Sequence, residues 1–341
     1  VKRFVSVANM INKSFNSYNF KINWRPKIVI TRNEVPEMLI APLREKCDVE
    51  ICLDRSRESL LKSIQNVDGI VWVSADKLDS EALDAAGGNL KVISTMTSGM
   101  DYVDSNEVRK RNILLGHTPN VVNDPVADVA IGLMIAAARR FHESRQFIEQ
   151  SQWIGGIDWM LGRDIPGSTV GIVGFGGIGQ TICKRLQTFN VGEFLYTCHN
   201  PKPEAEELRA KFVSFEHLLK ESDFIFVACP LTNETSNLFN HDAFSKMKST
   251  CVFINIARGG IVDQDALIEA LENRRIFSAG LDVCTPEPLP SDSKLLKLAN
   301  CIVIPHLGTS TSQSLEQMFK IAAHNVFSGL CGDNLPFPYN K

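Results

Sequence analysis

The stretch Thr169–Gly179, TVGIVGFGGIG, constrains this chain more than any other, because a short apolar run breaks there into glycines and then into a helical pattern. The apolar half is typical of a buried parallel strand. Gly174, Gly176 and Gly179 follow it at the G-x-G-x-x-G spacing, and apolar residues continue beyond them at helical intervals. This order of strand, glycine turn and helix predicts a dinucleotide-binding βαβ unit.

The three glycines have separate physical roles in such a turn. Gly174 permits the tight turn, Gly176 lets the backbone approach a pyrophosphate, and Gly179 lets the helix lie close to the strand. Backbone N–H groups at the start of the helix, including those of Gly177 and Ile178, then face the phosphates. The alternative is a plain glycine-rich turn, which the flanking strand and helix make the weaker interpretation.

Composition narrows the classes of protein that remain. With 341 residues and 44% apolar content, the chain is long enough for two domains with cores. No segment has the run of about 18 apolar residues that a membrane span needs, and a net charge of −3 gives no argument for nucleic acid or a membrane surface. The nine cysteines are odd in number and form no C-x-x-C pair, so we expect reduced thiols and no metal site.

The first 33 residues differ from the rest, because they hold seven Lys and Arg residues and no acid before Glu34. An acid-poor basic leader resembles a mitochondrial transit peptide. A disordered tail is the equal alternative. We therefore treat residues 1–25 as a leader or tail, apart from the fold. We expect a cytoplasmic protein, and the basic leader makes a mitochondrial location the alternative.

Short β-branched runs alternate with helical patterns along the rest of the chain, which predicts an α/β fold with parallel sheets. The expected strands of the first half are Lys27–Ile30, Val49–Ile51, Gly69–Val73, Leu90–Ser94 and Ile113–Leu115. Those after the glycine turn are Phe194–Tyr196, Phe224–Ala228, Cys251–Ile254, Phe277–Leu281 and Cys301–Ile304. A helix over Pro125–Phe141 is expected to cross between the domains, and a last helix, Ser312–Phe327, to return to the first.

These elements predict two doubly wound parallel-sheet domains with a cleft between them. Residues 26–122 and 312–341 would form a discontinuous, flavodoxin-like substrate domain. Residues 123–311 would form a Rossmann-type coenzyme domain that binds NAD(P).

The end of the strand after the glycine turn indicates which dinucleotide binds. NAD sites carry an acid there for the ribose 2′-hydroxyl, and a 2′-phosphate repels that acid. Here the strand end reads YTCHNPK, with no acid until Glu204. His199, Asn200 and Lys202 offer a cation and donor groups to a phosphate. The sequence therefore predicts NADPH as the cofactor, with NADH as the weaker alternative. The other interpretation is that this segment is a solvated loop that does not select between the two cofactors.

Three charged residues stand just beyond strand ends in the second half of the chain. Arg258 follows VFINIA, Glu287 lies in TPEPLP, and His306 follows IVIP. Parallel strands end at one edge of a sheet, so these side chains are expected to converge there. A guanidinium holds a carboxylate with two hydrogen bonds, and a histidine beside a carboxylate serves as an acid, which is what reduction of a 2-keto acid requires. Each residue alone also fits a structural or solvated role.

The first half of the chain carries a second candidate anion site. The segment TMTSGMD follows an expected strand, where Ser98 and Gly99 would present backbone N–H groups. A plain turn is the alternative interpretation.

From about Pro26 onward the chain resembles the D-isomer-specific 2-hydroxyacid dehydrogenases, and among them the animal glyoxylate/hydroxypyruvate reductases. The resemblance is carried by NLKVISTM, GFGGIG, SDFIFVACPLT, KMKSTCVFINIARGG, AGLDVCTPEPLP and NCIVIPHLGTST. It implies that Arg258 binds and polarises the substrate, that His306 is the acid–base and that Glu287 is its partner. It also implies that Ser98 and Gly99 contact the substrate carboxylate. Asp282 and Ile256 would lie near the nicotinamide, and Pro230 and Gly308 would lie along the rest of the cofactor.

The resemblance further implies a homodimer joined through the coenzyme domains, with a loop containing Trp153 and Trp159 that reaches toward the partner. The expected reaction is NADPH-dependent reduction of hydroxypyruvate to D-glycerate and of glyoxylate to glycolate. Two alternatives stay open: a phosphoglycerate dehydrogenase-like enzyme, and a non-enzymatic NAD(H)-binding protein like the C-terminal-binding corepressors.

Overall fold

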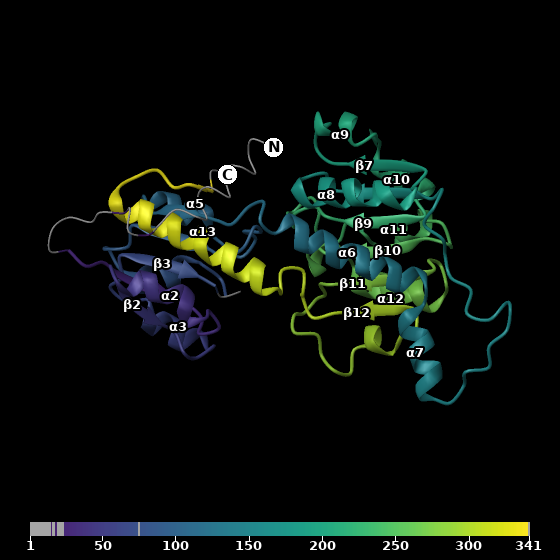
Figure 1. Cartoon of the computed structure of the whole chain (residues 1–341), viewed down its shortest axis with the longest axis horizontal. Coiled ribbons are helices and arrows are strands. Elements are labelled where there is room, and N and C mark those ends of the chain that lie inside the picture. Colours follow the sequence, from purple (N-terminus) through teal and green to yellow (C-terminus); the bar gives the residue numbers. More distant parts are fainter. Residues whose placement is uncertain (1–14, 16–17, 19–23, 74–75, 340–341) are drawn as a thin grey trace. The chain divides into compact units, whose positions relative to one another are not determined.

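A computed structural model describes residues 15, 18, 24–73 and 76–339 (Figure 1). The chain divides into two compact units, the first formed by Val1–Val122 with Thr311–Lys341 and the second by Asn123–Ser310. In each unit, every pair of neighbouring named strands runs parallel. Two parallel-sheet α/β domains are what the alternating elements predicted.

The first unit contains a five-stranded sheet in the order β2-β1-β3-β4-β5, which is the flavodoxin-like order. Its strands are β1 (Lys27–Ile30), β2 (Asp48–Ile51), β3 (Gly69–Trp72), β4 (Val92–Thr95) and β5 (Leu114–Gly116). Its helices are α2 (Glu37–Arg44), α3 (Arg57–Ser63), α4 (Ser80–Ala86), α5 (Ser105–Lys110) and α13 (Ser312–Cys331). Residues of β3 and β4 are all buried, because helices cover both faces of the sheet.

Helix α13 lies across β3 and β4 (Figure 1). Its Asn325 is fully buried, and its amide donates to Ser94 Oγ at 3.0 Å and to the carbonyl of His117 at 3.2 Å. Asn325 Oδ1 accepts the N–H of Phe337 at 2.9 Å. A buried amide is stable only when its groups are paired, so these bonds fix α13 to the sheet and to the C-terminal segment.

The segment expected to be a leader or tail, residues 1–25, lies mostly outside the described residues. Two members that are described contact α13: the Phe15 ring stacks on His324 with centroids 4.5 Å apart, and Tyr18 is buried. The Tyr18 hydroxyl lies 3.1 Å from Nδ1 of His324. These two aromatic residues therefore pack with the first unit.

The second unit contains a seven-stranded sheet in the order β12-β11-β10-β9-β6-β7-β8. Its strands are β6 (Thr169–Val173), β7 (Glu193–Thr197), β8 (Ala210–Phe212), β9 (Phe224–Val227), β10 (Val252–Asn255), β11 (Ser278–Leu281) and β12 (Cys301–Val303). The strand order reverses between β6 and β9, so this is a Rossmann-type sheet whose topological switch point lies at the end of β6.

Helices cover this sheet, and α6 packs on β10 and β11 beside α8 (Figure 1). The helices are α6 (Asn123–Ala138), α7 (Phe141–Glu149), α8 (Gly177–Leu186), α9 (Glu204–Glu207), α10 (Phe215–Glu221), α11 (His241–Lys246) and α12 (Gln264–Glu272). Single-turn 3₁₀ segments are η2 (Gln187–Phe189), η3 (Gly259–Ile261) and η4 (Lys294–Lys297). All residues of β9 and β10 are buried, which explains their continuous apolar sequence.

The helix expected over Pro125–Phe141 is present as α6, but it ends before Phe141 and lies wholly within the second unit, so the expectation that it crosses between the domains is wrong. Helix α6 ends at Ala138, Arg140 has a left-handed backbone with φ 57°, and α7 begins at Phe141. The Arg140 guanidinium makes two hydrogen bonds to Glu143, each 2.8 Å long, and the carbonyl of Ala138 accepts the N–H of Arg163 at 2.9 Å. The Ala138 carbonyl is thus bound by a residue distant in sequence and not by the next helical turn, so the local pattern did not reveal the break.

Two further expectations need correction. The last helix continues past Phe327 to Cys331 and ends at Gly332, which has φ 81° as helix-ending glycines often do. Strand β8 was not expected, because its three residues carry no clear alternation. In the part of the chain that the structure describes, no helix is long and apolar enough to cross a membrane.

Candidate active site

The glycine turn joins β6 to α8 at the switch point of the second sheet. Gly174 has φ 95°, and a Cβ atom there would lie 2.4 Å from the backbone N of Cys229. A Cβ at Gly179 would lie 2.3 Å from the carbonyl oxygen of Gly174. Only glycine fits at either position, as the predicted roles of tight turn and close helix packing require.

Gly176 differs, because a Cβ added there would meet no atom within 4 Å. It is the N-cap residue of α8, so the first backbone N–H groups of the helix, from Gly177 to Gly179, have no partner within the helix. Open space beside Gly176, next to these donors, suits the approach of a pyrophosphate, since a helix N-terminus favours anions. The chain's own backbone therefore suits the dinucleotide that the sequence predicted.

The end of β7 carries the residues predicted to select the cofactor. His199, Asn200 and Lys202 are exposed, and the Lys202 N–H donates to the Tyr196 hydroxyl at 2.9 Å. His199 Nε2 lies 3.5 Å from a carboxylate oxygen of Glu234, which comes from the loop after β9. Sequence reasoning missed Glu234, because it considered only acids in the segment that follows β7.

His306 and Glu287 lie at the carboxyl edge of the same sheet, after β12 and β11. Nδ1 of His306 is 2.9 Å from Oε2 of Glu287, and both side chains are partly exposed. The other carboxylate oxygen, Oε1, accepts the N–H of Cys284 at 3.0 Å. The carboxylate thus fixes the ring through Nδ1 and leaves Nε2 as the nitrogen that can exchange a proton with a substrate.

The contact between His306 and Glu287 shifts the pKa of each side chain. The hydrogen bond to Glu287 raises the pKa of His306 above its ordinary value, although burial and the charge of Arg258 oppose the change. Burial raises the pKa of Glu287, but the hydrogen bonds from His306 and from the Cys284 N–H outweigh it, so the pKa is lowered overall. Each partner therefore favours the charged form of the other.

Asp282, predicted to lie near the nicotinamide, follows β11 and is only 2% exposed. Its two carboxylate oxygens accept the N–H groups of Leu307 at 2.5 Å and Gly308 at 3.0 Å, and its carbonyl accepts the N–H of His306. Burial raises the pKa of Asp282, against the effect of these hydrogen bonds. Asp282 thus fastens the turn that presents the His306 ring.

Arg258 follows β10 in an extended conformation, with φ −144° and ψ 144°. Its carbonyl accepts the amide N–H of Asn255 at 3.0 Å, and Asn255 Oδ1 accepts the N–H of Ala257 at the same distance. Asn255 is 1% exposed, and sequence reasoning missed it, although an Asn at the end of an apolar strand is a usable signal. The Arg258 charge acts on both His306 and Glu287, so the three predicted residues share one edge of the sheet.

The other predicted site residues lie as follows. Pro230 follows β9, where its carbonyl accepts the Thr235 hydroxyl at 2.7 Å, and Ile256 is buried after β10. Ser98 and Gly99 belong to the first unit, in the turn after β4, where the Thr97 hydroxyl donates to the Gly99 carbonyl at 2.8 Å. The ligand contacts of these residues stay predictions.

A glycine turn at the start of α8 and a histidine–carboxylate pair on one Rossmann-type sheet are typical of nicotinamide-dependent oxidoreductases. Residues 131–308 match the family described as "D-isomer specific 2-hydroxyacid dehydrogenase, NAD binding domain", and the chain belongs to this family. It is accordingly an oxidoreductase that acts on 2-hydroxy acids.

Individual relatives resemble most of the chain. The glyoxylate reductase/hydroxypyruvate reductase of Homo sapiens is 43% identical over 317 residues, which are 91% of this chain and 96% of the relative. A crystal structure of the TT0316 protein from Thermus thermophilus is similar, with TM-score 0.85 and 36% identity over 92% of this chain and 100% of that one. The crystal structure of the NADPH-dependent glyoxylate/hydroxypyruvate reductase of Sinorhizobium meliloti, solved with NADP and malonate, is also similar. Its TM-score is 0.82, and it is 27% identical over 93% of this chain and 97% of that one.

Proposed function

We propose that this protein reduces hydroxypyruvate to D-glycerate and glyoxylate to glycolate, with NADPH as the preferred reductant. The observation that carries the proposal is the 2.9 Å contact between His306 Nδ1 and Glu287, at the sheet edge that also carries Arg258. The human and Sinorhizobium meliloti relatives are named for these two substrates. Reduction of a 2-keto acid needs a cation that binds the substrate carboxylate and a group that donates a proton. Arg258 would supply the first and His306 the second.

The residues divide the reaction between them. The Arg258 fork would hold the substrate carboxylate with two hydrogen bonds and polarise the keto oxygen. The bound nicotinamide would supply the hydride that goes to C2. His306 would donate the proton from Nε2 to the oxygen of C2, while Glu287 keeps the imidazole oriented and favours its charged form. Ser98 and Gly99 stay proposed as additional donors to the carboxylate.

The preference for NADPH rests on the end of β7. Lys202 and Asn200 are exposed there and offer a charge and a donor to a 2′-phosphate. Glu234 opposes them, since a carboxylate beside His199 repels a phosphate. We therefore propose a moderate preference for NADPH, with NADH also used.

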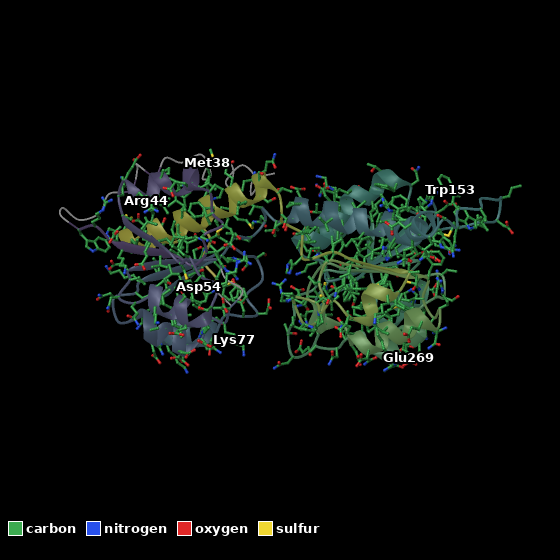
Figure 2. All side chains as sticks on the ribbon, turned by 90° about the horizontal axis from the view of Figure 1, so that it is seen from below. Met38, Arg44, Asp54, Lys77, Trp153 and Glu269 are labelled. Atoms are coloured by element: carbon green, nitrogen blue, oxygen red, sulfur yellow. The ribbon has the colours of Figure 1, made fainter. Side chains whose placement is uncertain are left out.

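The homodimer is proposed on the apolar segment between α7 and β6. Trp153 and Ile154 expose 67% and 83% of their surface, and Ile157 is fully exposed. In Figure 2 Trp153 lies on a loop that projects away from the rest of the second unit. Exposed apolar groups of this size commonly mark protein interfaces. We expect a dimer by light scattering, and a shift toward monomer in I154E/I157E.

A panel of substrates tests the function. The purified protein is assayed with hydroxypyruvate, glyoxylate, pyruvate and 3-phosphohydroxypyruvate, under NADPH and then NADH. We expect the highest kcat/KM with hydroxypyruvate and glyoxylate and with NADPH. A preference for 3-phosphohydroxypyruvate with NADH would indicate the phosphoglycerate dehydrogenase alternative, and no turnover of any keto acid would contradict the proposal.

A further inference from the structure

The loop that carries Glu287, Cys284–Pro288, is held by α12, a helix that bears none of the proposed catalytic residues. The N–H of Thr285 donates to the side-chain oxygen Oε1 of Gln264 at 3.1 Å. One residue earlier, the N–H of Cys284 donates to Glu287 itself. Consecutive N–H groups of the loop are therefore bound to Gln264 on one side and to the proposed partner of His306 on the other.

Gln264 is the first residue of α12, and the start of this helix is well fixed. The N-cap residue Asp263 accepts the N–H groups of Asp265 and Ala266, each at 3.2 Å. Ala266 and Leu267 are buried in the core of the second unit. A side chain at this position is thus attached to a rigid element, which is what the support of a site requires.

The backbone after Arg258 fixes the same loop from a second direction. A Cβ atom at Gly259 would lie 2.0 Å from the carbonyl oxygen of Cys284 and 2.5 Å from Oγ1 of Thr285. Real Cβ atoms do not approach backbone so closely, so the two loops can only be in contact because residue 259 is glycine. At the next position, Gly260, a Cβ would meet only the flexible end of Leu231, at 3.3 Å.

We propose that Gln264 is a positioning residue for the reduction, which acts through Thr285 and Glu287 on His306, and that Gly259 sets the spacing of the same loop. The proposal rests on the proposed function, because it concerns the acid of that reaction. Gln264 itself touches neither substrate nor cofactor in this account. Its role is to keep the Glu287 carboxylate within hydrogen-bond distance of the imidazole.

The charges around His306 make this proposal testable. The charged groups that act on its ring are Glu287, Asp282 and Arg258, and those that act on Glu287 are His306 and Arg258. Gln264 is uncharged. Its removal therefore changes the pKa of His306 only by moving Glu287, which lowers that pKa toward the ordinary histidine value.

The test compares Gln264→Ala with Gln264→Glu, which keeps a side-chain oxygen acceptor of the same length. We expect Q264A to lower kcat about tenfold with hydroxypyruvate, because small misplacements of a catalytic group are costly, with little change in KM. The upper midpoint of its pH–rate profile should move to lower pH. Q264E should restore kcat, and its added negative charge can only raise the pKa of His306. Asp265→Asn, at the exposed neighbouring position, is the matched control and should behave like the unaltered enzyme.

A second readout does not depend on turnover. The pKa of His306 is measured by NMR in histidine-labelled protein, with H306A used to identify its signals among the seven histidines. We expect a lower pKa of His306 in Q264A and not in Q264E or D265N. An unchanged pKa in Q264A, or no recovery in Q264E, would overturn the role of Gln264. Absence of keto-acid turnover in the unaltered protein would instead contradict the proposed function.

The glycines provide an independent pair of variants. Gly259→Ala should lower kcat and the pKa of His306 together, since the new methyl group must push the Cys284–Pro288 loop away. Gly260→Ala places the same methyl group against a flexible side chain and should leave both nearly unchanged. Equal effects of the two variants on the pKa would show that the close approach at Gly259 has no part in positioning Glu287.

Discussion

Glu234 lies 3.5 Å from His199, so an acid from the loop after β9 stands at the strand end whose own sequence carries none. Both side chains are largely exposed, and a surface ion pair of this kind contributes about 0.2–1 kcal/mol. The two side chains would act on a 2′-phosphate in opposite ways. His199 attracts the phosphate when protonated, and Glu234 repels it.

We therefore expect Glu234→Gln to raise the ratio of kcat/KM with NADPH to that with NADH by about 1.4- to fivefold, the range that a surface ion pair allows. Lys202→Glu is the opposite variant, because it puts a carboxylate where a cation stood, and it should move the ratio toward NADH. Both ratios are measured with hydroxypyruvate at saturation. If neither variant changes the ratio, the end of β7 does not select the cofactor.

Substitution of His306 tests the proton donor. His306→Ala should lower kcat for reduction by about 10²- to 10⁴-fold, the usual contribution of a positioned acid. We propose that the dinucleotide binds at the glycine turn, so its Kd, measured by protein fluorescence, should stay within about twofold. A variant that retains a tenth or more of the activity would show that another group delivers the proton.

The pH dependence of reduction follows from the pair of His306 and Glu287. In the proposed reaction the charged imidazole donates the proton, so the rate should fall as pH rises through the pKa of His306, which Glu287 raises above about 6.5. Glu287→Gln keeps the shape but removes the charge, and it should move this midpoint to lower pH. The profiles of kcat against pH for the two proteins give the measurement. A midpoint at higher pH in E287Q would contradict the assignment.

Much of the fold was predictable because its signals are local. The apolar runs gave the central strands of both sheets, and the G-x-G-x-x-G spacing located the switch point at Gly174. The proximity of His306 to Glu287 was also within reach, since parallel strands end at one edge of a sheet. The break after Ala138, whose carbonyl accepts the N–H of Arg163, and the pairing of His199 with Glu234 depend on residues that are close only after folding. The role of Gln264 is of the same kind, because its partner Thr285 is 21 residues away in sequence.

Asp282 holds the turn that presents His306, because its two carboxylate oxygens accept the N–H groups of Leu307 and Gly308. Asp282→Asn replaces one acceptor oxygen by an NH₂ group, which cannot accept a hydrogen bond. One backbone N–H beside a nearly fully buried side chain then loses its partner, which costs about 1–3 kcal/mol. We expect a lower free energy of unfolding in urea, together with a lower kcat, because the same turn presents His306. Asp265→Asn makes the same chemical change at an exposed position and should alter neither quantity. Unchanged stability in D282N would show that Asp282 does not hold the turn, and a loss of stability with full activity would show that the turn can relax without displacing the acid.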